Sequence, residues 1–216
     1  MITSDGWLDW VERVPGPPDK VYSTPNGAMG YIPHSMVGYL TGWYSRLFST
    51  ARTGTSRHGG IHLPQGGDYT PYAAASVHGS ILYTGHTIQH YPFTASCWAS
   101  GAVYPNTHFV AFENEGGYSP VDEPLRPGQV AANIRIIREL AEWRQWEYIR
   151  RPVDGNDYGA SLYEHRECIR WGALATACPS DRISQVYQEL QEEPMLKLIQ
   201  RRSSNHVYAL ASDGRK

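Results

Sequence analysis

Apolar residues with the spacing of an amphipathic helix are clearest between residues 128 and 146. The apolar side chains recur every three or four positions, so they share one helical face, while charged side chains mostly occupy the other. The apolar face comprises Val130, Ile134, Ile137 and Ala141. We predict a helix over 128–146 that packs one side against a core.

Three other ranges, 4–13, 35–50 and 181–192, show shorter forms of this pattern. Ser and Asp are favoured at helix N-termini because a side-chain oxygen can accept a hydrogen bond from a free backbone amide. Such residues stand at the start of each range: Ser4, Ser35, and Ser180 or Asp181. We therefore predict helices over these three ranges as well.

Short apolar runs bounded by polar, Gly or Pro residues predict strands between the helices. A Thr-Gly-His sequence around Gly85 predicts the turn of a hairpin. The predicted strands cover residues 29–33, 76–83, 87–90, 108–115 and 160–166. Because strands and helices interleave, the pattern favours an α/β architecture.

The last part of the chain, 194–216, fits this pattern less well. Pro194 ends the preceding helix, and a basic linker at 200–204 leads into a strand-like run followed by an Asp-Gly turn. We expect residues 1–193 to form one domain. Residues 194–216 are then either a tail or the truncated start of a second module.

Composition excludes several classes of function. The formal net charge of -2 gives no general reason to bind nucleic acid or an anionic membrane. The N-terminus lacks the basic and apolar segments of a signal peptide, and no apolar run is long enough to span a membrane. We therefore expect a cytosolic protein that does not insert into membranes.

Three cysteines, an odd number, argue against a disulfide framework, although a bridge between Cys97 and Cys168 stays possible. The third, Cys178, is separated from His165 by twelve residues and lies in a Thr-Ala-Cys-Pro sequence. Imidazole and thiolate are the preferred protein ligands of zinc. Among the other histidines, His34 is distinguished because it ends a predicted strand, and a rigid element would fix its ring. The background histidines are His58, His62, His86 and His206.

Several motifs, in order from about Gly30 to Ile183, make the chain resemble the zinc N-acetylmuramoyl-L-alanine amidases of phage endolysins, bacterial recycling enzymes and peptidoglycan recognition proteins. The last motif, His165…Thr176-Ala-Cys178-Pro, is similar to the family's closing motif. The run Asn106 to Glu113 resembles the family's third strand. The resemblance implies a central mixed β-sheet flanked by helices, and Zn²⁺ held by His34, His165 and Cys178.

Members of this family use either a Tyr on the second strand or a Glu on the third as the group that moves the proton. Val77 stands at the Tyr position here and cannot move a proton, so the resemblance implies that Glu113 is the general base and acid. Glu115 is a reserve candidate because alternation places it on the same face. The family's remaining catalytic position falls on Thr176, which could donate to a developing oxyanion or could be an ordinary turn residue.

Other residues are expected to border a substrate groove. Trp98 could stack on a sugar or a stem peptide. Asn106 and His78 are the other candidates, although His78 could equally be a packed strand histidine. Glu167 could orient a metal ligand or simply be solvated. The long Gly-rich loop at 51–72 could form one wall of the groove.

The resemblance implies a peptidoglycan hydrolase that cleaves the amide bond between N-acetylmuramic acid and L-alanine. We expect a monomeric phage or prophage endolysin that stays in the host cytoplasm until it is released to the cell wall. The alternatives are a cytosolic amidase that recycles muropeptides and a non-catalytic peptidoglycan-binding protein of the same fold. A metallopeptidase with a His-Glu-x-x-His helix is excluded because that sequence does not occur.

Overall fold

The computed structural model describes residues 1–40, 75–117, 120, 122–147, 150, 161–192, 197–200 and 207–210. The predicted loop at 51–72 therefore lies outside the described residues. Within these ranges no helix has both the length and the apolar character needed to cross a membrane.

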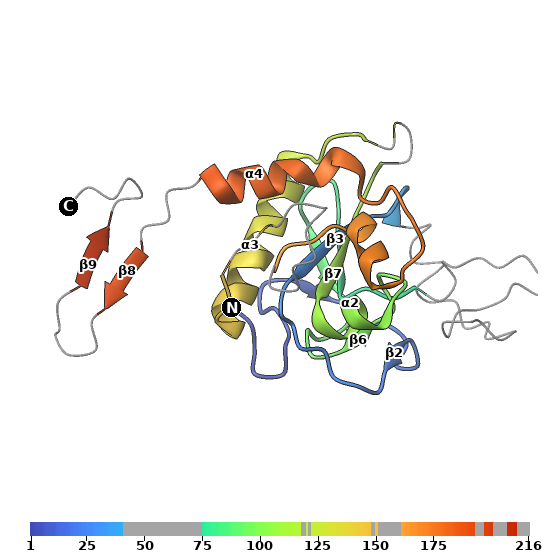
Figure 1. Ribbon diagram of the computed structural model, residues 1–216, viewed down its shortest axis with the longest axis horizontal. Coiled ribbons are helices and arrows are strands. Elements are labelled where there is room, and N and C mark those ends of the chain that lie inside the picture. Colours follow the sequence, from blue (N-terminus) through green and yellow to red (C-terminus); the bar gives the residue numbers. More distant parts are fainter. Residues whose placement is uncertain are drawn as a thin grey trace, which may run out of the picture.

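A mixed sheet of five strands forms the centre of the fold (Figure 1). The strand order is β1-β5-β4-β7-β3, in which β4 and β5 pair antiparallel and the other neighbours pair parallel. The strands are β1 (Glu12–Arg13), β3 (Tyr31–Ser35), β4 (Gly79–Ile81), β5 (Thr87–Gln89) and β7 (Val110–Asn114). This mixed sheet, with helices against it, confirms the predicted α/β class.

The remaining elements surround the sheet or follow it. The helices are α2 (Val103–His108), α3 (Pro127–Arg144), η2 (His165–Trp171), η3 (Ser180–Ile183) and α4 (Ser184–Glu192). Two small antiparallel ribbons pair β2 (Val21–Tyr22) with β6 (Ser96–Cys97), and β8 (Lys197–Gln200) with β9 (Val207–Leu210). The strand predicted in the tail corresponds to β9, whereas α2 and β8 were not predicted.

The main core lies between the sheet, α3 and α4, and α4 passes across the upper end of α3 in Figure 1. The predicted face of α3 is buried, since Val130, Ile134, Ile137 and Ala141 are each at most 8% exposed. Burial of so many aliphatic groups supplies the main driving force for this packing. The helix predicted over 128–146 is thus confirmed with its bounds moved by one or two residues.

A chain of buried polar contacts connects α3 with the end of the sheet. The Tyr31 hydroxyl donates to Asn133 Oδ1 at 2.6 Å, and Asn133 Nδ2 donates to Asn114 Oδ1 at 2.7 Å. Asn114 Nδ2 in turn donates to the carbonyl of His34 at 3.1 Å. Because a buried polar group is costly unless it is bonded, this chain specifies the position of His34 relative to the core.

The predicted hairpin is present as β4 and β5, each shorter than predicted. Gly85 lies in its turn with φ +86°, and an added Cβ would come within 2.5 Å of the Gly128 carbonyl oxygen. Glycine is therefore required both by the left-handed backbone and by the close approach of the turn to the start of α3.

The strand predicted over 29–33 is shifted to β3, so Ser35 ends a strand rather than starting a helix. The predicted helix over 35–50 is wrong at its start: residues 35–39 are not helical, and 41–50 lie outside the described residues. Pairing with β7 up to Ser35 gives the backbone partners that a helix would otherwise supply. β3, which contains Pro33, lies at the edge of the sheet, where a strand tolerates a residue without a backbone N–H.

The helix predicted over 4–13 is also wrong. The segment folds as turns followed by β1, with Gly6 at φ +88°. Its backbone groups find tertiary partners: the Leu8 amide donates to Gln89 Oε1 at 2.8 Å, and Gln89 Nε2 donates to the Gly6 carbonyl. These contacts replace the hydrogen bonds of a helix, and they could not be foreseen from spacing alone.

In the described residues, the strand predicted over 160–166 is replaced by isolated bridges of Leu162 with Tyr31 and with Arg150, and by η2, which begins at His165. The physical reason is the capping arrangement of Glu164 and Glu167, in which a Glu167 carboxylate oxygen accepts the Glu164 amide at 2.6 Å. That arrangement starts a helical turn where the apolar pattern suggested a strand.

The closing helix is confirmed, as η3 followed by α4. Its predicted cap is not: no side-chain hydrogen bond caps η3, whose preceding residue is Pro179. Asp181 instead accepts a hydrogen bond from Arg166 at 3.1 Å. The division between residues 1–193 and 194–216 remains a prediction.

Candidate metal centre

His34 is held near the carboxyl end of β3. It is 2% exposed, and its neighbour in the register of β7 is Glu113. The strand and the Asn114 contact fix its backbone, so the ring has little freedom. Nε2 of His34 is buried and has no hydrogen-bond partner among the described residues.

His165 is the first residue of η2, where a network of charged residues fixes the helix start. Arg150 contacts both carboxylate oxygens of Glu167, at 2.8 and 2.7 Å, and donates to Glu164 at 3.0 Å. Glu167 is 1% exposed, which excludes the alternative of a solvated side chain. It fixes the backbone just before His165 rather than the ring, whose Nδ1 is buried without a partner in the described structure.

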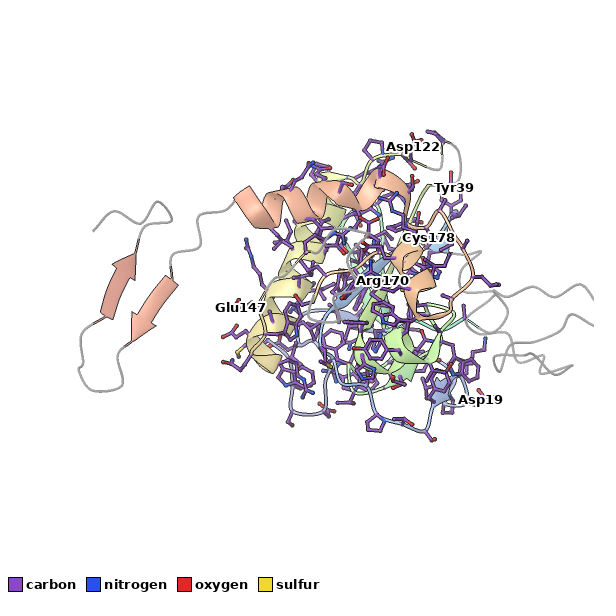
Figure 2. All side chains as sticks on the ribbon, in the orientation of Figure 1. Asp19, Tyr39, Asp122, Glu147, Arg170 and Cys178 are labelled. Atoms are coloured by element: carbon purple, nitrogen blue, oxygen red, sulfur yellow. The ribbon has the colours of Figure 1, made fainter. Side chains whose placement is uncertain are left out.

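Cys178 lies in the turn between η2 and η3, toward the upper right of the molecule in Figure 2. Thr176 Oγ1 accepts the Cys178 amide at 3.1 Å, and the Cys178 carbonyl accepts the Arg166 amide at 2.7 Å. The sulfur itself accepts the Ser35 amide at 3.3 Å. The last contact joins the turn directly to the end of β3.

These three side chains, distant in sequence, meet in one place. Potential ligand atoms of His34, His165 and Cys178 all lie within 4.8 Å of one another, and the two imidazole centroids are 4.3 Å apart. Two buried ring nitrogens without partners would be costly unless something binds them. Two imidazoles and one sulfur form a donor set that suits zinc, with a coordination position left for another group. The residues therefore fit a divalent metal of this kind.

The electrostatics of the cluster agree with such a site. Burial lowers the pKa of His165 to about 4 and holds the pKa of His34 well below its usual range, an effect that the neighbouring His165 and His78 increase. Both imidazoles are thus neutral near pH 7 and keep a lone pair for a metal. Burial, followed by the charge of Glu113, raises the pKa of the Cys178 thiol, whereas the Ser35 amide and Arg182 favour the thiolate.

Glu113 lies beside this cluster. It pairs in register with His34 on one side and with Ser80 of β4 on the other, and it is 8% exposed. Glu115, the reserve candidate, is already engaged: its carboxylate accepts the backbone amides of Leu40 and Tyr83, at 3.3 and 3.0 Å. Of the two carboxylates, the geometry favours Glu113 as a group that can exchange protons beside the cluster.

Thr176 has the turn role, and this role does not exclude the other one. Its oxygen stabilises the turn by accepting the Cys178 amide. A hydroxyl that accepts one hydrogen bond still has its own hydrogen to donate. The side chain is partly exposed next to a candidate ligand, which is compatible with contact to a substrate.

Two of the expected groove residues are committed to the fold. His78 is fully buried, with Nε2 bonded to the Ala95 carbonyl at 2.8 Å and Nδ1 accepting the Ala111 amide at 3.0 Å, which favours the packed role over a groove contact. Asn106 is 3% exposed and its Oδ1 accepts the backbone amides at 99 and 100. Trp98 is partly exposed and packs edge-on against Tyr22, so it keeps a surface for stacking.

Other sequence expectations concern residues away from the cluster. Cys97 and Cys168 are buried free thiols in separate core clusters, so the possible bridge is not formed. His86 is an exposed partner of Glu12, as suits a background histidine. The other background residues, His58, His62 and His206, lie outside the described residues.

Sequence reasoning missed Ser35, whose amide contacts the cluster, and Arg182, which bonds to Ser35. Ser35 was interpreted as a helix start, and Arg182 carried no motif. A signal was present only for Ser35, since it directly follows a candidate ligand. An Arg four residues after a Cys has no pattern that distinguishes it from a surface cation.

Comparison with known proteins supports the fold through structure rather than sequence. No protein-family model matches the chain, and no curated protein sequence is similar enough to match it. Solved structures do match. N-acetylmuramoyl-L-alanine amidase LysC from Clostridium intestinale URNW is 14% identical, with a TM-score of 0.53, over 86% of this chain and 100% of that one.

Two further solved structures match the fold to a similar degree. The endolysin N-acetylmuramoyl-L-alanine amidase LysCS from Clostridium intestinale URNW is 15% identical, with a TM-score of 0.50, over 87% of this chain and 99% of that one. A point mutant of PlyL is 11% identical, with a TM-score of 0.55, over 85% of this chain and 99% of that one. The chain therefore has the fold of solved N-acetylmuramoyl-L-alanine amidases.

Proposed function

We propose that this protein is a zinc-dependent N-acetylmuramoyl-L-alanine amidase that hydrolyses peptidoglycan between N-acetylmuramic acid and L-alanine. The observation that carries the proposal is the convergence of His34, His165 and Cys178 within 4.8 Å, with Glu113 in register beside His34. The likeness to solved amidases, at low identity, supports the same reaction class.

His34, His165 and Cys178 would hold the zinc. Zinc bound there supplies Lewis acidity, which polarises a carbonyl group and makes a water molecule more acidic. The protein contributes two neutral imidazoles and a sulfur that the Ser35 amide orients. Only one ligand is fully buried, since His165 and Cys178 are partly exposed, which gives solvent and substrate a route to the cluster.

Glu113 has the role of moving the proton. As the water oxygen attacks the lactyl carbonyl carbon, the carboxylate takes the proton that the water releases. The same group then gives that proton to the amide nitrogen as the carbon–nitrogen bond breaks, so L-alanine leaves as a neutral amine. Thr176 donates its hydroxyl hydrogen to the carbonyl oxygen while negative charge develops there.

We also propose that the enzyme works as a phage or prophage endolysin and that one chain suffices for activity. The likeness to LysCS, whose name describes an endolysin, supports the first statement. The second is supported by the site itself, because the three candidate ligands and Glu113 all come from this chain.

The test is digestion of purified cell walls by the pure protein. We expect new L-alanine amino termini without new reducing sugar ends, and loss of this activity when a chelator removes the metal. Release of reducing ends instead would indicate a glycosidase. Binding to walls without any bond cleavage would support the non-catalytic alternative. A parallel assay with small soluble muropeptides separates an endolysin, which cleaves intact walls, from a recycling amidase, which cleaves only the small substrates.

A further inference from the structure

Arg182 is a buried cation next to the candidate metal centre. It lies in η3, four residues after Cys178, and it is 3% exposed. Its three nitrogens donate to three separate places: the Glu123 carbonyl, Ser35 Oγ and, at 2.8 Å, the Glu115 carbonyl. All three acceptors are uncharged oxygens. Among the described residues, no carboxylate forms an ion pair with this guanidinium.

A buried guanidinium without a paired carboxylate needs a nearby negative charge to offset its lost hydration. The groups whose charge acts on Arg182 are Glu123 first, then Tyr83, the Cys178 sulfur and Glu113. The guanidinium nitrogens are thus bonded to neutral oxygens, while the positive charge acts on Glu123 and, more weakly, on the candidate ligand Cys178 and the candidate base Glu113.

Ser35 connects Arg182 with the sulfur. Its hydroxyl accepts from Arg182 and donates to the Gly116 carbonyl at 3.4 Å. Its amide donates to Cys178 Sγ at 3.3 Å. Ser35 directly follows His34 in the chain and contacts the Cys178 sulfur, so it links two candidate ligands. Arg182 binds the side chain of this linking residue.

We propose that Arg182 is a positioning residue for the metal centre, which acts through Ser35 to direct a backbone amide at the Cys178 sulfur and to fix the end of β3 that carries His34. This inference rests on the proposed zinc site. Groups that orient metal ligands from outside the coordination sphere commonly change metal affinity by about 10-fold to 100-fold when they are removed.

Two features separate this role from ordinary packing. An apolar side chain of similar length could fill the same space, but it would remove the Arg182 donor from Ser35 Oγ and the Glu123 carbonyl, and it would leave the Glu115 carbonyl with Gln129 Nε2 alone. The network also touches the ends of both strands that carry the candidate site, β3 and β7, rather than the core beneath α3. A loss of zinc affinity without an equal loss of fold stability is therefore the expected consequence.

The experiment measures the zinc dissociation constant by competition with a chelator, and the near-ultraviolet and visible absorption of the cobalt-loaded protein, well below the unfolding temperature. The variants are Arg182→Met, Arg182→Lys and Ser35→Ala. Gln89→Ala is the matched control, because Gln89 is also fully buried and makes hydrogen bonds to three backbone groups, but in β5 on the other side of β4.

We expect Arg182→Met to weaken zinc binding by about 10-fold to 100-fold and to shift the sulfur-to-cobalt absorption band. Arg182→Lys, which keeps the charge, should recover part of the affinity. Ser35→Ala, which keeps the amide, should show a smaller loss and a smaller band shift. Gln89→Ala should lower the unfolding temperature and leave zinc affinity and the band unchanged.

Wild-type affinity and an unchanged band in Arg182→Met would overturn the proposal, and so would equal losses in Gln89→Ala. If Arg182→Met does not fold, Arg182→Lys and Ser35→Ala decide by the same two measurements. The wild-type arm separates this inference from the proposed function, since a wild-type protein that binds no zinc contradicts the metal centre itself.

Discussion

His34 and Glu113 occupy opposite positions in the parallel register of β3 and β7. Side chains in register on neighbouring strands project to the same face of a sheet, so a candidate metal ligand and a candidate proton carrier are fixed next to each other by two rigid elements. Both residues are one position before the end of their strands. Sites in such sheets are commonly found at these carboxyl ends.

The first prediction concerns metal content. The pure protein should contain about one zinc per chain, because His34, His165 and Cys178 form one cluster of donors. Cys178→Ser should lose most of this zinc, since a serine hydroxyl is a much poorer ligand than a thiolate. Elemental analysis after gel filtration measures the ratio.

Cys97→Ser is the matched control for that variant. Cys97 is a buried free thiol in a core cluster that lacks the three candidate ligands. It should keep its zinc. If Cys178→Ser retained zinc at the wild-type ratio, the metal would be bound elsewhere.

The second prediction concerns the proton carrier. Glu113→Gln should keep zinc and fold normally but lose turnover by about 10²-fold to 10⁴-fold, which is the usual contribution of a general acid–base group. The amide is similar in size to the carboxylate but cannot accept a proton at neutral pH. Initial rates of amide cleavage together with zinc content provide the measurement.

Glu115→Gln tests the alternative carboxylate. Because Glu115 accepts hydrogen bonds from two backbone amides, its replacement should mainly lower the unfolding temperature and should have little effect on turnover. Turnover that survives in Glu113→Gln and disappears in Glu115→Gln would transfer the catalytic role to Glu115.

The third prediction concerns Thr176. Thr176→Val should lower kcat by about 10-fold to 100-fold, because valine cannot donate to a developing oxyanion. Thr176→Ser should retain most of the rate, since it keeps the hydroxyl and its bond to the Cys178 amide. Zinc content is measured in both variants, and equal rates in the two proteins would leave Thr176 with the turn role alone.

The fourth prediction concerns stability at acidic pH. His90 is 1% exposed, and burial lowers its pKa to about 4 from an ordinary value of 6.5. Below pH 6.5 the unfolded chain binds a proton at this position and the folded protein does not, so stability falls as pH drops from 6.5 toward 4. The free energy of unfolding that is lost through His90 over this pH range is at most about 3 kcal/mol.

His90→Gln isolates that effect, because glutamine does not titrate. Other groups titrate in the same window, so the quantity to compare is the difference in urea-unfolding free energy between wild type and His90→Gln at about pH 7 and about pH 4.5. The wild type should lose stability relative to the variant on acidification. A difference independent of pH would show that His90 becomes protonated without cost in the folded state.

The parts of the fold that local pattern determines were predicted well. Helix α3 follows from a long apolar face, and the β4–β5 hairpin follows from a glycine turn between two apolar runs. Both depend on contacts between residues close in the sequence, and that is the information a single sequence carries. The predicted helix at 4–13 failed because Gln89, 81 residues after Leu8, supplies a hydrogen-bond partner to this segment.

The candidate site divides in the same way. Residue chemistry and motif order in the sequence determined which side chains were candidates, namely His34, Glu113, His165 and Cys178. Only the tertiary structure decided that the three candidate ligand atoms meet, that Glu113 rather than Glu115 lies beside them, and that His78 and Asn106 belong to the framework. The role of Arg182 also required the fold, because its contacts join residues 35, 115 and 123, and no local pattern encodes contacts between distant segments.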